Sequence, residues 1–372
     1  MSKRTPSYCM IFEAVGPYGG IGRVAFDAIR VAQEAGYQVT VVAKLMDESL
    51  RGEVEWLPLY VPPKFFYLKW ITAAKYMREA LAGRKFDIIH SHQPQAAHMS
   101  DLFQCHFLTR IAAERNCLQA PDSPKGAFHR LQEMGVLRAE DNCYKSWNPK
   151  TRMLYVSEMI ARQFRRLYGK PPMDQVLSNA AMPMKIPTQA ERLAARSKLF
   201  GDGFIGTGPV LGYIGGVTER KGYRQLISAL EGDSDVVLLM GGLGAQGFEA
   251  PTLKGRFKST GLVNDMESFY AACDVFAVPS YFDPCPLVVF EAAARGLPVI
   301  ATDGVGNLPN LLEYHCGAEW KFNSPITPIV HDLISRRAEC NEGAARMTEA
   351  LSKQNWKSRL LATYEEILNE KE

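Results

Sequence analysis

Short apolar segments alternate along the chain with segments in which apolar residues recur every three or four positions. The apolar segments, bounded by glycine and proline, predict these β-strands: Tyr8–Ala14, Gln38–Ala43, Ile88–Ser91, Leu102–His106, Met153–Ser157, Val176–Leu177, Val210–Ile214, Val236–Met240, Val275–Pro279 and Val299–Thr302. The periodic segments predict these helices: Arg23–Ala35, Tyr67–Leu81, Glu158–Tyr168, Tyr223–Leu230, Asp265–Cys273, Leu287–Arg295 and Leu308–Tyr314. Strands that are apolar throughout and alternate with helices are typical of parallel sheets covered on both faces. We therefore expect an α/β fold.

The alternation runs twice, and a stretch with weak periodicity separates the two runs. This stretch, Asn179–Thr188, contains two prolines and is interpreted as a linker. A chain of 372 residues suggests two domains of ordinary size. We expect the domains to cover residues 1–185 and 186–355, followed by a final amphipathic helix at Trp356–Leu368.

The amino-acid composition indicates which class of protein this chain belongs to. Hydrophobic residues make up 47% of the chain and charged residues 22%, which is typical of a soluble globular protein. No apolar run approaches the ~20 residues that a membrane-spanning helix needs. The N-terminal sequence MSKRTPSYCMIFEAV lacks a small-residue cleavage site, so it predicts a first strand rather than a signal peptide. Eight scattered cysteines without a C-x-x-C pair indicate reduced thiols, and we expect a cytoplasmic protein.

Charge is distributed unevenly between the two halves. Residues 1–185 carry 25 Lys and Arg against 17 Asp and Glu, whereas residues 186–372 carry 18 against 23. A basic first half suits contact with an anionic surface, such as the inner face of a plasma membrane. The alternative, chance scatter of charges, stays open.

The most informative segment runs from Pro279 to Thr302, and it predicts a strand end, a loop, a helix and a second buried strand. Asp283 opens the loop, and Glu291 follows eight residues later inside the helix. The helix is expected to begin near Pro286, because proline suits the first helical position. The N–H groups of the next residues then point out of a helix end that favours anions. The two acids could contact a sugar and a ribose on one diphosphate.

This segment resembles the signature of glycosyltransferase family 4, the retaining nucleotide-sugar transferases with the GT-B fold. The signature consists of an acid, seven residues, a second acid, an alanine and then Gly-x-Pro-Val; this chain has Asp283 where the family usually has glutamate. The resemblance implies two doubly wound Rossmann-like domains that face each other across a cleft. It further implies that residues 1–185 and a C-terminal helix at 356–372 bind the acceptor, and that residues 186–355 bind the donor.

Two glycine-rich turns strengthen the resemblance. Gly16–Arg23 joins a predicted strand to a helix, and such a turn lets the backbone approach a phosphate. Gly215–Gly222 follows another strand and places two adjacent cations where a diphosphate leaves. An ordinary tight turn and a solvated pair of cations are the alternatives.

The resemblance also implies roles for individual residues. Glu291 is expected to bind ribose, Asp283 to hold the sugar, and a histidine at a strand end, His106, to lie near the transferred sugar; His92 is the weaker candidate for that place. The residues expected to be catalytic are Asp283, His106, Arg220 and Lys221. Those expected to bind the donor are Gly19, Gly20, Gly216, Arg220, Lys221, Pro286, Leu287, Val288 and Glu291.

Three other patterns suggest different chemistry. Gly242–Gly247 fits the G-x-G-x-x-G pattern of dinucleotide-binding proteins, but no clear βαβ unit follows it. Asp233 and Asp235 resemble a D-x-D metal site, yet they precede a strand, whereas sites in open α/β sheets follow strands. His90 and His92 are expected to point to opposite faces of their strand, so that they cannot chelate a metal together. We expect no metal.

Two segments rich in aromatic and basic residues are candidates for a membrane surface or for acceptor binding. They are Lys64–Trp70 with Lys75 and Arg78, and Phe107–Arg138. The alternative for the first is a core-facing helix with charged edges. Nucleic acid is not an expected partner, because no recognition motif accompanies the modest charge.

Together these patterns predict a retaining, metal-independent glycosyltransferase. The expected donor is a UDP-sugar, with a GDP-sugar as the second choice, and the expected acceptor is a glycan or a lipid-linked molecule in bacterial-type surface polysaccharide or glycolipid synthesis. A nucleotide-sugar binding protein or an epimerase with the same fold remains the alternative.

Overall fold

Two α/β units make up the part of the chain that the computed structural model describes, which is residues 4–60, 66–115, 124–201, 208–232 and 235–371. Unit 1 comprises Met1–Ala113, Leu118–Asn179 and Gln354–Glu372. Unit 2 comprises Glu114–Cys117 and Ala180–Lys353. Each unit has its own sheet and its own apolar core.

Unit 1 contains a seven-stranded sheet with the strand order β5-β3-β1-β6-β7-β8-β9, and every neighbouring pair is parallel. The strands are β1 (Ser7–Ile11), β3 (Gln38–Ala43), β5 (Glu55–Pro58), β6 (Ile88–Ser91), β7 (Leu102–Cys105), β8 (Arg152–Tyr155) and β9 (Asp174–Val176). Two short strands, β2 (Ala14–Val15) and β4 (Leu45–Met46), form a separate parallel pair.

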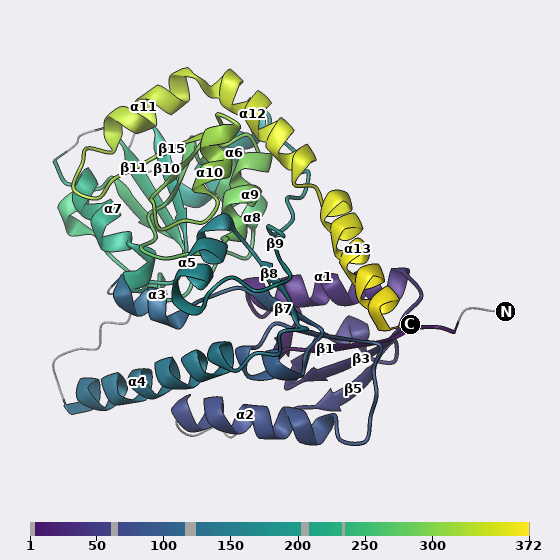
Figure 1. The fold of residues 1–372 in the computed structure, drawn as a ribbon. Coiled ribbons are helices and arrows are strands. Elements are labelled where there is room, and N and C mark those ends of the chain that lie inside the picture. The colour runs from purple at the N-terminus through teal and green to yellow at the C-terminus, as the bar shows by residue number, and fades with distance from the viewer. Residues whose placement is uncertain (1–3, 61–65, 116–123, 202–207, 233–234, 372) are drawn as a thin grey trace. The chain divides into compact units, whose positions relative to one another are not determined.

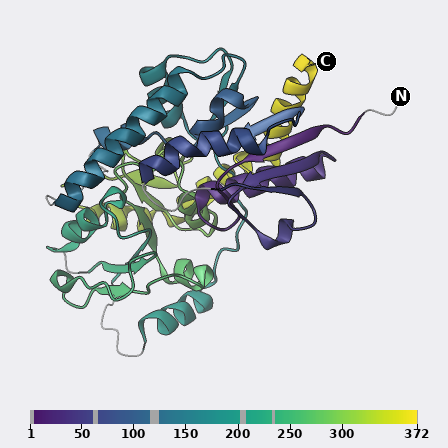
Figure 2. The same ribbon diagram turned by 90° about the horizontal axis from the view of Figure 1, so that it is seen from below.

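Helices cover both faces of this sheet. They are α1 (Gly20–Glu34), α2 (Phe66–Ala80), α3 (Thr109–Glu114), α4 (Pro124–Lys145), α5 (Glu158–Tyr168) and α13 (Lys353–Lys371). Helices α2 and α4 lie side by side (Figures 1 and 2). Helix α13 packs near α1 and β1, because Lys357 pairs with Glu34 and the hydroxyl of Tyr364 lies 3.0 Å from that of Tyr8.

Unit 2 contains a six-stranded parallel sheet with the order β12-β11-β10-β13-β14-β15. Its strands are β10 (Val210–Ile214), β11 (Val237–Gly241), β12 (Phe257–Ser259), β13 (Val275–Val278), β14 (Val299–Ala301) and β15 (Gly317–Glu319). Its helices are α6 (Gln189–Phe200), α7 (Tyr223–Leu230), α8 (Met266–Ala272), α9 (Leu287–Ala294), α10 (Leu308–Glu313), α11 (Thr327–Ser335) and α12 (Arg337–Ala350). Leucines of α7 and α11 share one buried cluster with the strands.

Strand order fixes where a ligand site is expected in each unit. In both sheets the first strand lies inside, the next strands are added on one side, and the chain then returns to the other side. This is the doubly wound Rossmann-like order, and it confirms the predicted α/β fold with two Rossmann-like domains. The order reverses at the first strand, because the chain adds strands first on one side of it and later on the other. The point of reversal lies between β1 and β6 in unit 1 and between β10 and β13 in unit 2. Ligands of such sheets bind at the carboxyl ends of the strands at these switch points.

The predicted elements match where the apolar pattern is strong. Strands β3, β6 and β10 and helices α5 and α7 have the predicted bounds. The prediction omitted β5, β12 and β15, which are three or four residues long and largely polar or half-buried. It also omitted the two-residue strands β2 and β4 and the helices α3, α4, α6, α11 and α12. None of the helices in the described ranges is long and apolar enough to span a bilayer.

Candidate functional site

The switch point of unit 2 brings together two loops that are 62 residues apart in the sequence. The loop after β10 contributes Arg220, whose Nη1 donates to the carbonyl of Phe282 at 2.7 Å. The carbonyl of Arg220 in turn accepts from the N–H of Tyr281 at 2.9 Å. Lys221 forms an ion pair with Asp283. The sequence-predicted cations and the predicted acid therefore lie together at the carboxyl ends of β10 and β13.

Glycine is required where the first of these loops enters α7. Gly222 has a φ of +66°, and a Cβ at this position would lie 1.7 Å from the carbonyl oxygen of Pro279. Any other residue would force the two loops apart. The Lys-Gly pair therefore combines a cation with the close approach that brings this cation to Asp283.

In the structure Lys221 pairs with Asp283, although the sequence analysis assigned Lys221 to the diphosphate and Asp283 to the sugar. Their side chains are only 20% and 12% exposed, so each charge largely compensates the other. The backbone of Asp283 is also engaged: its N–H donates to Gly304 at 2.8 Å, and its carbonyl accepts from Gly306 at 2.9 Å. The loop after β14 thus holds Asp283 in place, and the N–H groups left for an anion are those at the start of α9.

Helix α9 begins at Leu287, with Pro286 preceding it, as predicted. The N–H of Val289 donates to the carbonyl of Pro286 at 3.2 Å, whereas the N–H groups of Leu287 and Val288 have no partner within the helix, since the first N–H groups of an α-helix lack one. Glu291 lies one turn further on and accepts a hydrogen bond from the hydroxyl of Tyr270 at 3.0 Å. The guanidinium of Arg295 lies 4.8 Å from the centre of the Tyr270 ring. Tyr270 was missed by the sequence analysis, because nothing in its local sequence links it to a residue 21 positions away.

The switch point of unit 1 carries a cavity of about 210 Å³. Its wall includes Phe12 and Glu13 from the loop after β1, His92 from the loop after β6, and His106 from the loop after β7. Glu140 and Tyr144 of α4 close the other side. Sequence analysis identified His106 but not Glu140, which lies just beyond the candidate segment Phe107–Arg138.

Three histidines form a buried row beside this cavity. Nε2 of His106 lies 3.0 Å from Nδ1 of His92, and the rings of His92 and His90 are 4.8 Å apart. Nδ1 of His90 lies 3.0 Å from the hydroxyls of both Tyr8 and Tyr364. The expectation that His90 and His92 point to opposite faces is therefore wrong. Side chains two positions apart in a strand share a face, and His92 continues the path of β6.

Burial decides the protonation of this cavity's titratable groups. It lowers the pKa of His106 and of His90 to about 3, so both rings are neutral at physiological pH. It raises the pKa of Glu140 to about 7, although Thr109 donates to both of its oxygens. The cavity thus contains neutral imidazoles and the carboxyl of Glu140, which titrates near neutrality, and its wall also includes the carboxyl of Glu13.

The glycine-rich turn of unit 1 leads directly into α1. Gly19 precedes the helix with a φ of +126°, and Gly20 is its first residue. A Cβ added at either glycine would meet nothing within 4 Å. The start of this 15-residue helix is therefore open on its approach side, as phosphate binding by a helix N-terminus requires.

The structure also describes the surroundings of the glycine-rich and acidic patterns that suggested other chemistry. No α-helix follows β11 within residues 242–250, so Gly242–Gly247 lacks the strand–turn–helix context of a dinucleotide site. Asp235 pairs with His331 at 2.8 Å, and Asp233 lies outside the described residues. Among the residues with described side chains, no three His, Cys, Asp or Glu are grouped so that they could hold a metal ion.

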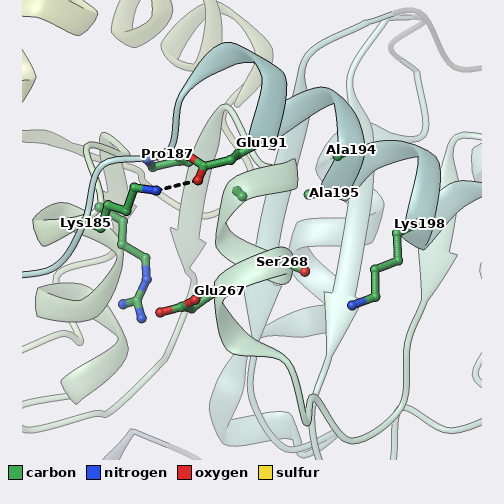
Figure 3. A pocket seen from close by; sticks show the side chains of 10 residues that line it. Lys185, Pro187, Glu191, Ala194, Ala195, Lys198, Glu267 and Ser268 are labelled. Carbon is green, nitrogen blue, oxygen red and sulfur yellow. Dashed lines mark hydrogen bonds and ion pairs between the residues drawn. The ribbon is translucent and has the colours of Figure 1, made fainter.

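A second cavity, of about 310 Å³, lies elsewhere in unit 2 (Figure 3). Residues of α6, α8 and the preceding linker form its wall. Figure 3 shows Lys185 directed at Glu191, with Lys198 on the opposite side of the pocket. Lys198 pairs with Asp265. Arg295, which also lines this pocket, connects it to the neighbourhood of Glu291.

Comparison with known families agrees with the motif. A model described as "Glycosyl transferases group 1" matches residues 208–321, and one described as "Glycosyltransferase Family 4" matches residues 18–177. A D-inositol 3-phosphate glycosyltransferase of Mycolicibacterium vanbaalenii is 28% identical over 254 residues, which cover 60% of this chain and 53% of that protein. One of Kribbella flavida is 27% identical over 337 residues, covering 79% and 76%. The chain spans about half the length of the first curated relatives that it matches.

Solved structures share the fold at low sequence identity. WaaG, a glycosyltransferase involved in lipopolysaccharide biosynthesis, is similar with a TM-score of 0.75 at 18% identity, covering 97% of this chain and 99% of that one. HepE of Anabaena, solved in complex with UDP-glucose, is similar with a TM-score of 0.69 at 16% identity, covering 97% and 100%. At this identity the likeness establishes the arrangement of the backbone alone.

Proposed function

Because the chain belongs to glycosyltransferase family 4, the group 1 glycosyltransferases, we propose that it transfers a sugar from a nucleotide diphosphate sugar to an acceptor hydroxyl. We favour a UDP-sugar as the donor, since HepE, which shares the fold, was solved with UDP-glucose. One observation carries the proposal. Arg220, Lys221, Asp283 and the start of α9 converge at the switch point of unit 2, where the fold binds ligands.

In this proposal unit 2 binds the donor. The start of α9 and Arg220 stabilise the diphosphate as it gains charge on leaving, because preorganised donors act most strongly on charge that develops in the transition state. Glu291, held by Tyr270, accepts hydrogen bonds from the ribose hydroxyls. Gly216 lets the loop after β10 approach the donor closely.

We assign Asp283 to holding the transferred sugar and not to forming a covalent bond with it. Its carboxylate is already paired with Lys221, which makes it a poor nucleophile. Reaction with retention then relies on the leaving phosphate to take the proton of the acceptor on the same face of the sugar. Unit 1 supplies the acceptor through its cavity, with His106, Gly19 and Gly20 near the reacting groups.

We further propose that the acceptor is a glycan or a lipid-linked molecule and that the protein works in the cytoplasm at a membrane surface. Phe128, Leu131 and Met134 on α4 are 48%, 65% and 51% exposed, at spacings that place them on neighbouring parts of the helix surface. Exposed apolar residues beside basic ones are typical of interfacial helices. Of the other candidate surface segment, residues 64 and 65 lie outside the described residues.

A thermal-shift screen tests the donor first. We expect UDP and UDP-sugars to raise the melting temperature more than GDP, ADP and their sugars do, since binding to the native state alone stabilises it. Labelled donor then separates transfer from epimerisation and from binding without turnover. Transfer should persist in excess EDTA. Activity that is abolished by EDTA and restored by Mn²⁺ would contradict metal-independent transfer.

A further inference from the structure

The contact between His106 and His92 restricts how His106 can meet a ligand. An imidazole ring has two nitrogens, and Nε2 of His106 is engaged with Nδ1 of His92 at 3.0 Å. Nδ1 is therefore the ring nitrogen of His106 that remains for a substrate in the cavity. Whether this nitrogen donates or accepts depends on where the hydrogen between the two rings resides.

His92 is held in a fixed orientation by its neighbours. It is 4% exposed, and its ring lies 4.7 Å from that of His106, 4.8 Å from that of His90 and 6.0 Å from that of Phe12. His90 is anchored in turn by the hydroxyls of Tyr8 and Tyr364. The C-terminal helix α13 thus contributes, through Tyr364, to the packing behind His92.

Counting hydrogens on the neutral pair selects one arrangement. Both rings are buried and neutral, so a single hydrogen lies between Nδ1 of His92 and Nε2 of His106. Nε2 of His92 is fully buried and has no hydrogen-bond partner among the described residues. In native proteins a buried N–H without a partner is rarer than a buried acceptor without one. The hydrogen of His92 therefore belongs on Nδ1, where it donates to His106.

We propose that His92 is a positioning residue, whose Nδ1–H donates to Nε2 of His106 and so keeps the hydrogen of His106 on Nδ1. His106 then meets the substrate as a hydrogen-bond donor to an oxygen, and not as a base. This inference rests on the proposed function, because it takes His106 to contact the sugar or the acceptor.

Nitrogen NMR of the histidine rings tests the assignment without any substrate. Two-bond couplings in protein labelled with ¹⁵N-histidine distinguish the two neutral tautomers, and the His106→Asn variant identifies the signals of His106. We expect wild-type His106 to carry its hydrogen on Nδ1. In His92→Phe, which keeps an aromatic ring but removes the donor, Nε2 of His106 should still carry no hydrogen, because an Nε2–H that faces the Phe ring would have no partner; its ¹⁵N resonance should move downfield, since the hydrogen bond that it accepts is lost. His98→Phe, at an exposed site of the 3₁₀ helix Pro94–Met99, is the matched control and should leave the signal unchanged.

Two outcomes overturn the proposal: the Nε2–H form in the wild type, or an Nε2 resonance of His106 that has the same position in His92→Phe as in the wild type. The wild-type spectrum decides even where the variant does not fold. His92→Asn, whose amide N–H can take over donation, should return this resonance at least part of the way to its wild-type position, and a resonance that stays at the His92→Phe position also counts against the proposal.

Release of UDP from UDP-glucose supplies a second readout. His92→Phe should lower kcat about 100-fold with little change in the affinity for UDP, because UDP is assigned to unit 2. His92→Asn should recover part of this loss. If wild-type protein neither binds UDP nor releases it, the proposed donor is wrong while the tautomer result stands. If wild-type protein is active and His92→Phe equals it, the positioning role is wrong.

Discussion

The two switch points have the same place in two similar sheets but opposite chemistry. In unit 2 the loops carry full charges, which are compensated by the pair of Lys221 with Asp283. In unit 1 the corresponding place carries a row of buried histidines whose pKa values are far below their usual range. The strand order therefore determines where a site forms, and the side chains determine what it binds.

The difference suits two different ligands. A diphosphate carries charge wherever it binds, so its site needs cations and free N–H groups. An acceptor hydroxyl is neutral, and buried neutral groups can orient it without the cost of burying an ion. The comparison predicts that charge removal impairs unit 2 and that hydrogen-bond changes or titration impair unit 1.

The largest effect is expected for Arg220→Ala, which removes a cation from the charged switch point. Transfer should slow about tenfold to a thousandfold, because the developing charge of the leaving diphosphate loses a donor. Steady-state kinetics with a labelled UDP-sugar measures this. Arg224→Ala, which removes an exposed arginine paired with Glu219, is the matched control and should be nearly silent. A wild-type rate in Arg220→Ala would remove this residue from the donor site.

Substitutions of Asp283 and of Glu291 should change different kinetic parameters. Asp283→Asn should mainly lower kcat, since the sugar gains charge in the transition state, whereas Glu291→Gln should mainly raise KM, since ribose is bound throughout. Asp283→Glu should lose rate up to about a hundredfold, because one added methylene displaces the carboxylate from Lys221. If Asp283→Glu matches the wild type, the position tolerates either acid. An unchanged kcat in Asp283→Ala would mean that this loop does not hold the sugar.

Lys221→Ala should cost stability as well as rate, unlike Arg220→Ala. It leaves the carboxylate of Asp283, 12% exposed, without its partner, and we expect a loss of about 2 kcal/mol in the free energy of unfolding. Urea denaturation measures it. The double variant Lys221→Ala with Asp283→Asn should regain stability but not activity. Equal stability of the single and double variants would show that the pair does not compensate a buried charge.

The stability of unit 1 should fall as the pH rises, because of Glu140. Its pKa is raised to about 7 in the folded protein, so between the ordinary value of 4.5 and 7 the folded state binds more protons than the unfolded one. Stability is therefore fully present below about pH 4.5 and is lost progressively up to about pH 7. The melting temperature of Glu140→Gln should therefore change less over this pH window than that of the wild type, by a few degrees. Glu158→Gln, at an exposed site on α5, is the control, and an unaltered pH profile in Glu140→Gln would contradict the assignment.

The smallest effect concerns the surface of unit 1. Binding to vesicles should rise with anionic lipid and fall with salt, since exposed charges are screened over about 8–10 Å at physiological ionic strength. Leu131→Asp should weaken binding several-fold by placing a charge on the apolar surface of α4. Leu193→Asp, at an exposed site of α6 in unit 2, should not. Equal binding to neutral and anionic vesicles would leave a soluble acceptor.

The local sequence determined many of the helices and strands and the two loops of unit 2 that carry Arg220, Lys221 and Asp283. Strand β10, helix α7 and the start of α9 were predictable because apolar periodicity, glycine and proline act within a few residues. The resemblance to family 4 then identified Asp283, Glu291, Arg220 and Lys221 as donor-site candidates.

Only the tertiary structure decided which of these groups touch. The ion pair of Lys221 with Asp283 spans 62 residues, and the contact of His90 with Tyr364 spans 274. No local pattern encodes such pairs, because they depend on which strands become neighbours in the sheet. The same holds for Tyr270 beside Glu291 and for Glu140 in the cavity of unit 1. Their burial, and with it the raised pKa of Glu140 and the neutral histidines, exists only once strands and helices from distant segments have packed together.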